Sequence, residues 1–285
     1  MNKMETFEDY LGREQRAEDT IMRAPLQHLA AMLDSTVEEL APDGALPPLG
    51  HWGFFLDWPR QSRLGADGHA ERGDFLPPIA LPRRMLAGVQ LRFHQPLRIG
   101  EPAHKTSRIE SIQPKEGRSG QLYFVTVHHR VDGPSGLAIE EEQTIVYRTP
   151  TSGGGAAQPK SRDLPGESDR QRGRINPDPT LLFRFSAFTG NAHRIHYDRT
   201  YATETEGYPG LVVHGPLQAL LLLDTLRLTI GKPLDLAAFS FRSQRPLFDV
   251  AGFDCTIRDA ASDPVALATL DNEGNECTVA EATMR

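Results

Sequence analysis

The sequence is poor in cysteine, long apolar runs and basic charge, and each shortage excludes a class of protein. Its 285 residues include only Cys255 and Cys277. Two cysteines cannot build a disulfide framework, so we expect a reducing, cytoplasmic location. No unbroken apolar run is longer than the five residues 219–223, far short of the roughly 18 residues of a membrane span. The first residues also lack the apolar segment of a secretion signal.

Charge and glycine pattern exclude two further classes. The 31 Lys and Arg residues against 38 Asp and Glu residues give a formal charge of −7. An acidic chain lacks the basic footprint of nucleic-acid-binding proteins. The sequence contains neither a dinucleotide-binding glycine fingerprint nor a phosphate-binding loop, so we expect no cofactor. The 39% of hydrophobic residues is typical of a soluble globular protein.

A segment rich in Gly, Pro and Ser divides the chain near its middle. Such composition is typical of a solvated linker. We therefore predict a first domain over residues 1–150, a linker over 151–166 and a second domain over 167–285. Each domain is of ordinary size.

The two halves resemble each other. Pro-Leu-Gln occurs at residues 25–27 and again at 216–218, and a Pro-Leu pair at 96–97 is echoed at 246–247. The two Pro-Leu pairs are closer together in sequence than the two Pro-Leu-Gln motifs. The first half therefore contains extra residues between its two landmarks, and we place this insertion within residues 33–85. It includes both tryptophans, Trp52 and Trp58. We expect either a lid over a groove or an aromatic staple on the core.

The residue pattern in each half predicts one helix followed by strands. Proline is favoured in the first turn of a helix, and the residues after Pro216 are apolar almost all round, which indicates a buried helix. Short runs with β-branched or aromatic residues, bounded by Gly, Pro or Asp, predict strands at 89–97, 104–112, 122–131, 139–148, 238–245, 252–259, 265–271 and 276–284. The predicted class is α+β, with an antiparallel sheet wrapped around a helix in each half and the halves joined edge to edge.

Reactive side chains gather just before the second helix. His196 is the candidate acid or base, because an imidazole titrates near neutral pH. Asn191 cannot carry a proton but can position water or substrate. The amide of Gly215 starts the helix and can stabilise an enolate oxygen. A structural role for these residues is the alternative.

A metal site is a second alternative for the same segment. His193, His196, Asp198 and His214 are close in sequence, and imidazole with carboxylate is a zinc-binding set. Elsewhere, His128 and His129 lie in a strand, so at most one of the two can face a site. The acidic run 140–142 is interpreted as a solvated strand start.

The strings GNAHRIHYD and PGLVVHGPL resemble the motif of MaoC-like hotdog hydratases and dehydratases. Gly190, Ile195, His196, His214 and Gly215 match the pattern. Three positions depart from it, because the family's catalytic Asp is Asn191, its Asn is His193 and its Pro is Arg194. The variant is similar to the branch of type 2 hydroxyacyl-thioester dehydratases and of itaconyl-CoA and mesaconyl-C4-CoA hydratases. LPRRMLAGVQLRFHQPLRIGE and GRSGQLYFVTVHHRV resemble that branch too.

This resemblance implies a double hotdog fold, a homodimer and a CoA thioester substrate. It also implies a catalytic second half and a non-catalytic first half that shapes the binding tunnel. Hydration of itaconyl-CoA to citramalyl-CoA is the expected reaction. The alternatives are mesaconyl-C4-CoA, a general 3-hydroxyacyl thioester, and acyl-CoA binding without turnover.

A dicarboxylic acyl group needs a partner for its free carboxylate, and arginine binds a carboxylate through two hydrogen bonds. The candidates are Arg83, Arg84, Arg118, Arg184 and Arg194. We expect Arg184 and Arg194, with His193 and His214, to contact the substrate.

Overall fold

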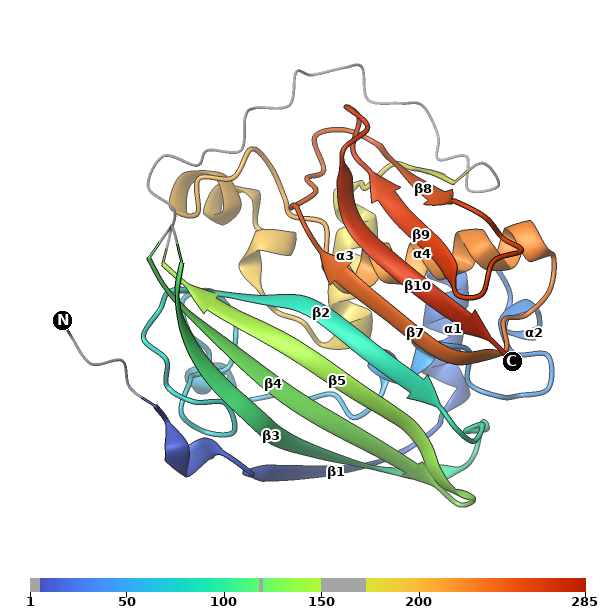
Figure 1. Ribbon diagram of the computed structural model, residues 1–285, viewed down its shortest axis with the longest axis horizontal. Coiled ribbons are helices and arrows are strands. Elements are labelled where there is room, and N and C mark those ends of the chain that lie inside the picture. Colours follow the sequence, from blue (N-terminus) through green and yellow to red (C-terminus); the bar gives the residue numbers. More distant parts are fainter. Residues whose placement is uncertain (1–5, 118–119, 150–172) are drawn as a thin grey trace.

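The computed structural model describes residues 6–117, 120–149 and 173–285, and within them one antiparallel sheet dominates (Figure 1). Its strand order is β1-β3-β4-β5-β2-β7-β10-β9-β8-β6. The predicted linker 151–166 and Arg118 lie outside the described residues. None of the described helices is long and apolar enough to cross a membrane.

All eight predicted strands are present. The strands are β1 Glu14–Thr20, β2 Arg83–Phe93, β3 Pro102–Gly117, β4 Gly120–Gly133, β5 Gly136–Arg148, β6 Arg174–Ile175, β7 Leu236–Ser243, β8 Phe253–Ile257, β9 Val265–Leu270 and β10 Glu276–Met284. Sequence reasoning missed β1 and β6. The edge strand β1 is mostly exposed and reads EQRAEDT, so it has neither an apolar alternation nor a β-branched core residue to indicate a strand.

The two halves meet where β2 pairs with β7. The pairing runs antiparallel from Gly88 opposite Arg242 to Arg92 opposite Ala238. Two five-stranded halves, β1–β5 and β6–β10, thus form one continuous sheet, and each covers an edge that the other would leave open. The predicted double hotdog, with its halves joined edge to edge, is confirmed.

The long helix α4, Gly215–Ile230, packs against strands β7 to β10 (Figure 1). Every residue from Leu217 to Leu226 is buried, as the mostly apolar sequence of this helix predicts. The one amide in this run, Gln218, accepts hydrogen bonds from the hydroxyls of Thr269 and Thr278 at 2.8 and 2.9 Å. These bonds fix the start of α4 against β9 and β10.

The first-half helix α1, Arg23–Met32, is shorter and contains Pro25 in its first turn. Helix α3, Pro179–Thr189, contacts α1. Residues 33–82, between α1 and β2, contain only the short helix α2, Val37–Leu40, and 3₁₀ turns such as Gly50–Gly53. The corresponding connection in the second half is only residues 231–235.

Part of the insertion packs on the core. Trp52 lies edge-on to Phe241, and its Nε1 donates to Glu141 at 3.1 Å, whereas Trp58 is exposed. Glu141 corrects the expectation of a solvated acidic run. It is 3% exposed, and an oxygen of its carboxylate lies 2.6 Å from His51 Nε2. Strand alternation turns this residue inward between two outward neighbours.

Candidate active site

The end of helix α3 shapes the loop that carries the candidate residues. Asp178 caps the start of the helix, and Gly190 ends it in the left-handed conformation (φ 63°) that glycine adopts without strain. The backbone N–H of Asn191 then donates to Ser186 O at 2.8 Å. The Asn191 side-chain oxygen accepts from the His193 backbone at 3.0 Å, so its amide nitrogen is the atom that can donate to a ligand.

His196 is held in one tautomer. Its Nδ1 lies 2.7 Å from the carbonyl oxygen of Val212. A carbonyl only accepts, so Nδ1 carries the proton and Nε2 keeps its lone pair. Burial lowers the pKa of His196 to about 4. The ring is therefore neutral at neutral pH, in the form that accepts a proton.

His214 lies directly against this ring. The two imidazoles are stacked, with centroids 3.6 Å apart and planes 18° apart. His214 Nε2 is 2.9 Å from the Ser186 hydroxyl, and burial lowers its pKa well below the ordinary value. Burial keeps each ring neutral, and the stack adds a barrier to protonating both, because two imidazolium rings would repel each other at this distance.

Gly215, the first residue of α4, follows at once. A Cβ atom at this position would lie 2.8 Å from Ser243 Oγ, so a side chain here would crowd the start of the helix. The N-terminal amides of a 16-residue helix attract partial negative charge.

One cleft of about 1510 Å³ joins these groups. Asn191, His193, His196, His214 and Gly215 all line it, together with first-half residues. The structure thus brings together five of the seven predicted site residues. Their chemical roles stay predictions.

Arg184 and Arg194 are not brought to the cleft. Arg184 is exposed on α3. Arg194 forms an ion pair with Asp198 at 2.7 Å, donates to Ala66 O at 3.0 Å and lies over the Tyr201 ring. Both were expected to bind substrate. The structure places neither on the cleft, since one side chain is exposed and the other is bound within its own loop, and their contact with substrate stays a prediction.

Two other candidate arginines, Arg83 and Arg84, do line the cleft. Arg83 is already engaged, since its Nη2 donates to Glu206 O at 2.9 Å and its Nε lies 3.3 Å from the Glu206 carboxylate. Arg84 is half-buried and follows it on β2.

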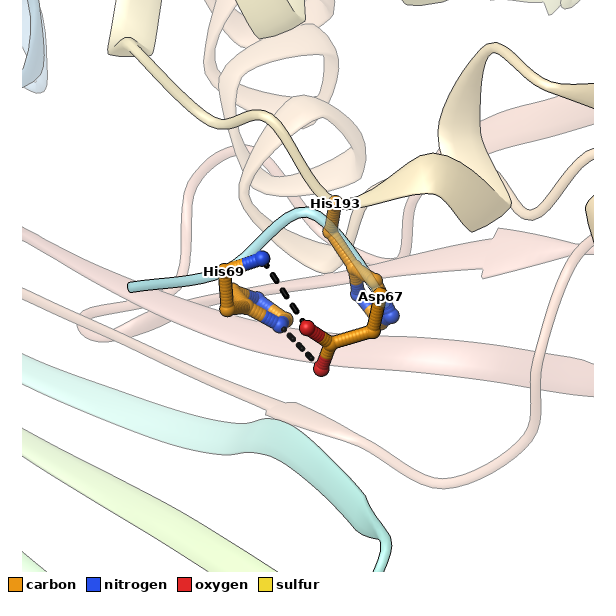
Figure 2. Close-up of side chains that lie close together, drawn as sticks. All are labelled: Asp67, His69 and His193. Atoms are coloured by element: carbon orange, nitrogen blue, oxygen red, sulfur yellow. Dashed lines mark hydrogen bonds and ion pairs between the residues drawn. The ribbon is translucent and has the colours of Figure 1, made fainter. Parts of the chain in front are cut away.

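The metal set that was weighed as an alternative is not formed, because Asp198 pairs with Arg194 and accepts from the Tyr201 backbone. A different group gathers instead (Figure 2). Asp67, His69 and His193 place one nitrogen or oxygen each within 4.8 Å of one another. Asp67 and His69 come from one turn of the insertion, and both line the cleft.

Sequence reasoning missed Asp67 and His69. His69 precedes Asn191 by 122 residues. No sequence pattern connects it or Asp67 to the motif loop, residues 190–198. The available signal was the glycine-flanked run GADGH at 65–69, a tight turn that presents an acid and an imidazole together. His129, by contrast, is buried against Ser107 at 2.7 Å and does not line the cleft.

Comparison with known proteins identifies the family of this chain. Residues 49–249 match the family of hydroxyacyl-thioester dehydratases type 2. The chain belongs to this family. The mesaconyl-C4-CoA hydratase of Chloroflexus aurantiacus is 51% identical over 244 residues, which cover 86% of each chain. The prediction of a hydro-lyase is confirmed at the level of the family.

Solved structures share the fold at low sequence identity. HtdX of Mycobacterium tuberculosis is 16% identical with a TM-score of 0.63. The match covers 96% of this chain and 100% of HtdX. A second protein of that organism, described as a double hotdog, is 11% identical with a TM-score of 0.55, and the match covers 98% of each chain.

Proposed function

We propose that this protein hydrates the double bond of a small dicarboxylic enoyl-CoA, with mesaconyl-C4-CoA as the first candidate and itaconyl-CoA as the second. The observation that carries the proposal is that His196, with its Nε2 lone pair free, and Gly215, at the start of α4, line the same cleft. The order of the two substrates follows the relative that is 51% identical, and it reverses the order expected from the motifs alone.

The geometry suits addition of water next to a thioester. The thioester carbonyl would lie at the start of α4, where the Gly215 N–H and the helix dipole stabilise an enolate oxygen. His196 Nε2 would accept a proton from water as the water oxygen bonds to the β carbon. A proton then reaches the α carbon, and the product contains one added water. The Asn191 amide nitrogen would hold the water or the product hydroxyl.

The free carboxylate of the substrate requires a cation in the cleft. Arg84 is the candidate, because it lines the cleft with the histidines, whereas Arg83 is paired with Glu206. A guanidinium binds a carboxylate through two parallel hydrogen bonds. Arg84→Lys keeps the charge but loses that geometry, so it should raise KM for a dicarboxylic substrate more than for crotonyl-CoA.

The test is turnover of mesaconyl-C4-CoA, itaconyl-CoA and crotonyl-CoA by the purified protein, with products read by mass. We expect the dicarboxylic substrates to gain one water much faster than crotonyl-CoA. His196→Ala should abolish turnover and Asn191→Ala should lower it strongly, while His28→Ala, on the exposed face of α1, should match the wild type. Ligand binding without turnover of any enoyl-CoA would refute the proposal and favour a binding protein.

A further inference from the structure

The motif loop lacks a free carboxylate. The family's acid position is Asn191 in this chain, and the nearby Asp198 is held by Arg194 and by the Tyr201 backbone. A proton-transferring imidazole usually works with a carboxylate that orients it and stabilises its charged form. The motif loop therefore offers no carboxylate that could orient an imidazole of the cleft.

The insertion supplies such a pair. The carboxylate of Asp67 accepts twice from His69, from its backbone N–H at 3.0 Å and from its ring Nδ1 at 3.0 Å. Nδ1 of His69 thus carries a proton, and Nε2 is the atom that can exchange one with a ligand. The His69 side chain is 21% exposed, so its ring reaches the cleft that it lines.

The turn that carries this pair is fixed on the motif loop. Backbone bonds close the turn, from Gly65 N to His69 O at 2.8 Å and from Gly68 N to Gly65 O at 2.9 Å. The Arg194 backbone then donates to Asp67 O at 2.9 Å. Gly68 has φ +89°, and a Cβ there would lie 2.0 Å from Ala192 O, so only glycine allows this close approach.

The His69 ring is in line with the other imidazoles of the cleft. Its centroid lies 4.0 Å from that of His193, which lies 5.5 Å from that of His196. Figure 2 shows His69 and Asp67 on one short segment of the insertion and His193 on a separate segment beside them. His193 therefore contacts an imidazole from each half of the chain, and all three rings line one cleft.

Among the groups that act on the pKa of His69, the Asp67 carboxylate is the one that favours the protonated ring. Burial alone would raise the pKa of the Asp67 carboxyl, but the bonds and charge of His69 hold it well below its usual range. The carboxylate stays ionised beside the ring. Burial lowers the pKa of His69, Asp67 opposes this, and Arg84 and Arg72 lower it further. Of the cleft histidines, His69 is the one whose ring bonds directly to a carboxylate.

We propose that His69, held by Asp67, is a further catalytic residue, which handles the proton at the α carbon while His196 handles the proton of water. This inference rests on the proposed hydratase function. His196 takes a proton from water as the C–O bond forms at the β carbon. His69 enters this step as an imidazolium paired with the Asp67 carboxylate, and it gives its Nε2 proton to the α carbon as the C–H bond forms. The proton on His196 then restores His69, so that one water is added and no other reactant is needed.

The experiment compares the wild type with His69→Gln, Asp67→Asn and a matched control. His94→Gln removes an imidazole that also pairs with a carboxylate, Glu140 at 2.8 Å, but lies outside the cleft. We expect kcat for hydration of the substrate to fall by about 10²–10³-fold in His69→Gln, with little change in KM. Asp67→Asn should give a smaller fall, and His94→Gln none.

A second readout separates proton transfer from folding. The hydroxyacyl product incubated in D₂O with the wild type exchanges its α hydrogen, and His69→Gln should lose this exchange. Exogenous imidazole should partly restore kcat to His69→Ala. Wild-type kcat in His69→Gln, or retained exchange, would overturn the role of His69 while leaving the hydratase intact. Stoichiometric bound metal whose removal by a chelator stops turnover would also overturn it, because the cluster would then be a metal site. A wild type inactive on every enoyl-CoA would overturn the hydratase and this inference with it.

Discussion

The stacked pair of buried histidines makes stability depend on pH in a definite direction. The pKa of His196 is about 4 in the folded protein, whereas an unfolded histidine titrates near 6.5. Between these values the unfolded chain binds a proton that the folded chain does not, so stability is lost as the pH falls through this window. His196 alone should remove about 2 kcal/mol of unfolding free energy between about pH 7 and about pH 4.5.

The measurement is urea unfolding followed by tryptophan fluorescence at several pH values, for the wild type and for His196→Gln. Acid should destabilise the wild type more than the variant, by about 2 kcal/mol over the same interval. Groups that do not contact His196 cancel in this difference. Equal pH slopes would show that His196 is protonated as readily in the folded protein as in the unfolded chain, and the neutral stack would be refuted.

Three further substitutions test the packing around the site. Glu141→Ala should lower the free energy of unfolding by about 3 kcal/mol, because it leaves the buried His51 without its partner; a change below about 0.5 kcal/mol would show that the pair is not buried as described. Gln218→Ala should cost about 2 kcal/mol in urea unfolding, since two buried threonine hydroxyls lose their acceptor. Gly215→Ala should lower kcat about 10²-fold by crowding Ser243 and displacing the amide, and steady-state rates near the wild type would exclude that amide from the reaction.

Most of the fold followed from the sequence because its signals are local. The apolar helix after Pro216 and the eight predicted strands bury the residues that their patterns indicate. The strand β1 escaped prediction because it is an exposed edge held mainly by backbone pairing with β3. Backbone pairing of this kind leaves no signature in side-chain type.

The candidate site was predictable only in part, because it joins distant segments. Asn191, His196 and Gly215 are close in sequence and lie in the cleft as expected. Asp67 and His69 reach it through the close approach of Gly68 to Ala192, which no pattern within either segment reveals. Arg194 was a candidate because it lies within the motif. Its side chain instead pairs with Asp198, which a turn of the loop brings close to it.

The β2–β7 pairing, called the seam here, determines how the protein unfolds. Since the sheet runs unbroken through the pairing of Gly88–Arg92 with Ala238–Arg242, neither half can open without exposing a long strand edge of the other. Amide protons at this seam should therefore exchange with solvent only through global unfolding. Calorimetry should show a single transition rather than one for each half. The β2–β7 pairing therefore predicts that the two halves unfold together, in one cooperative transition.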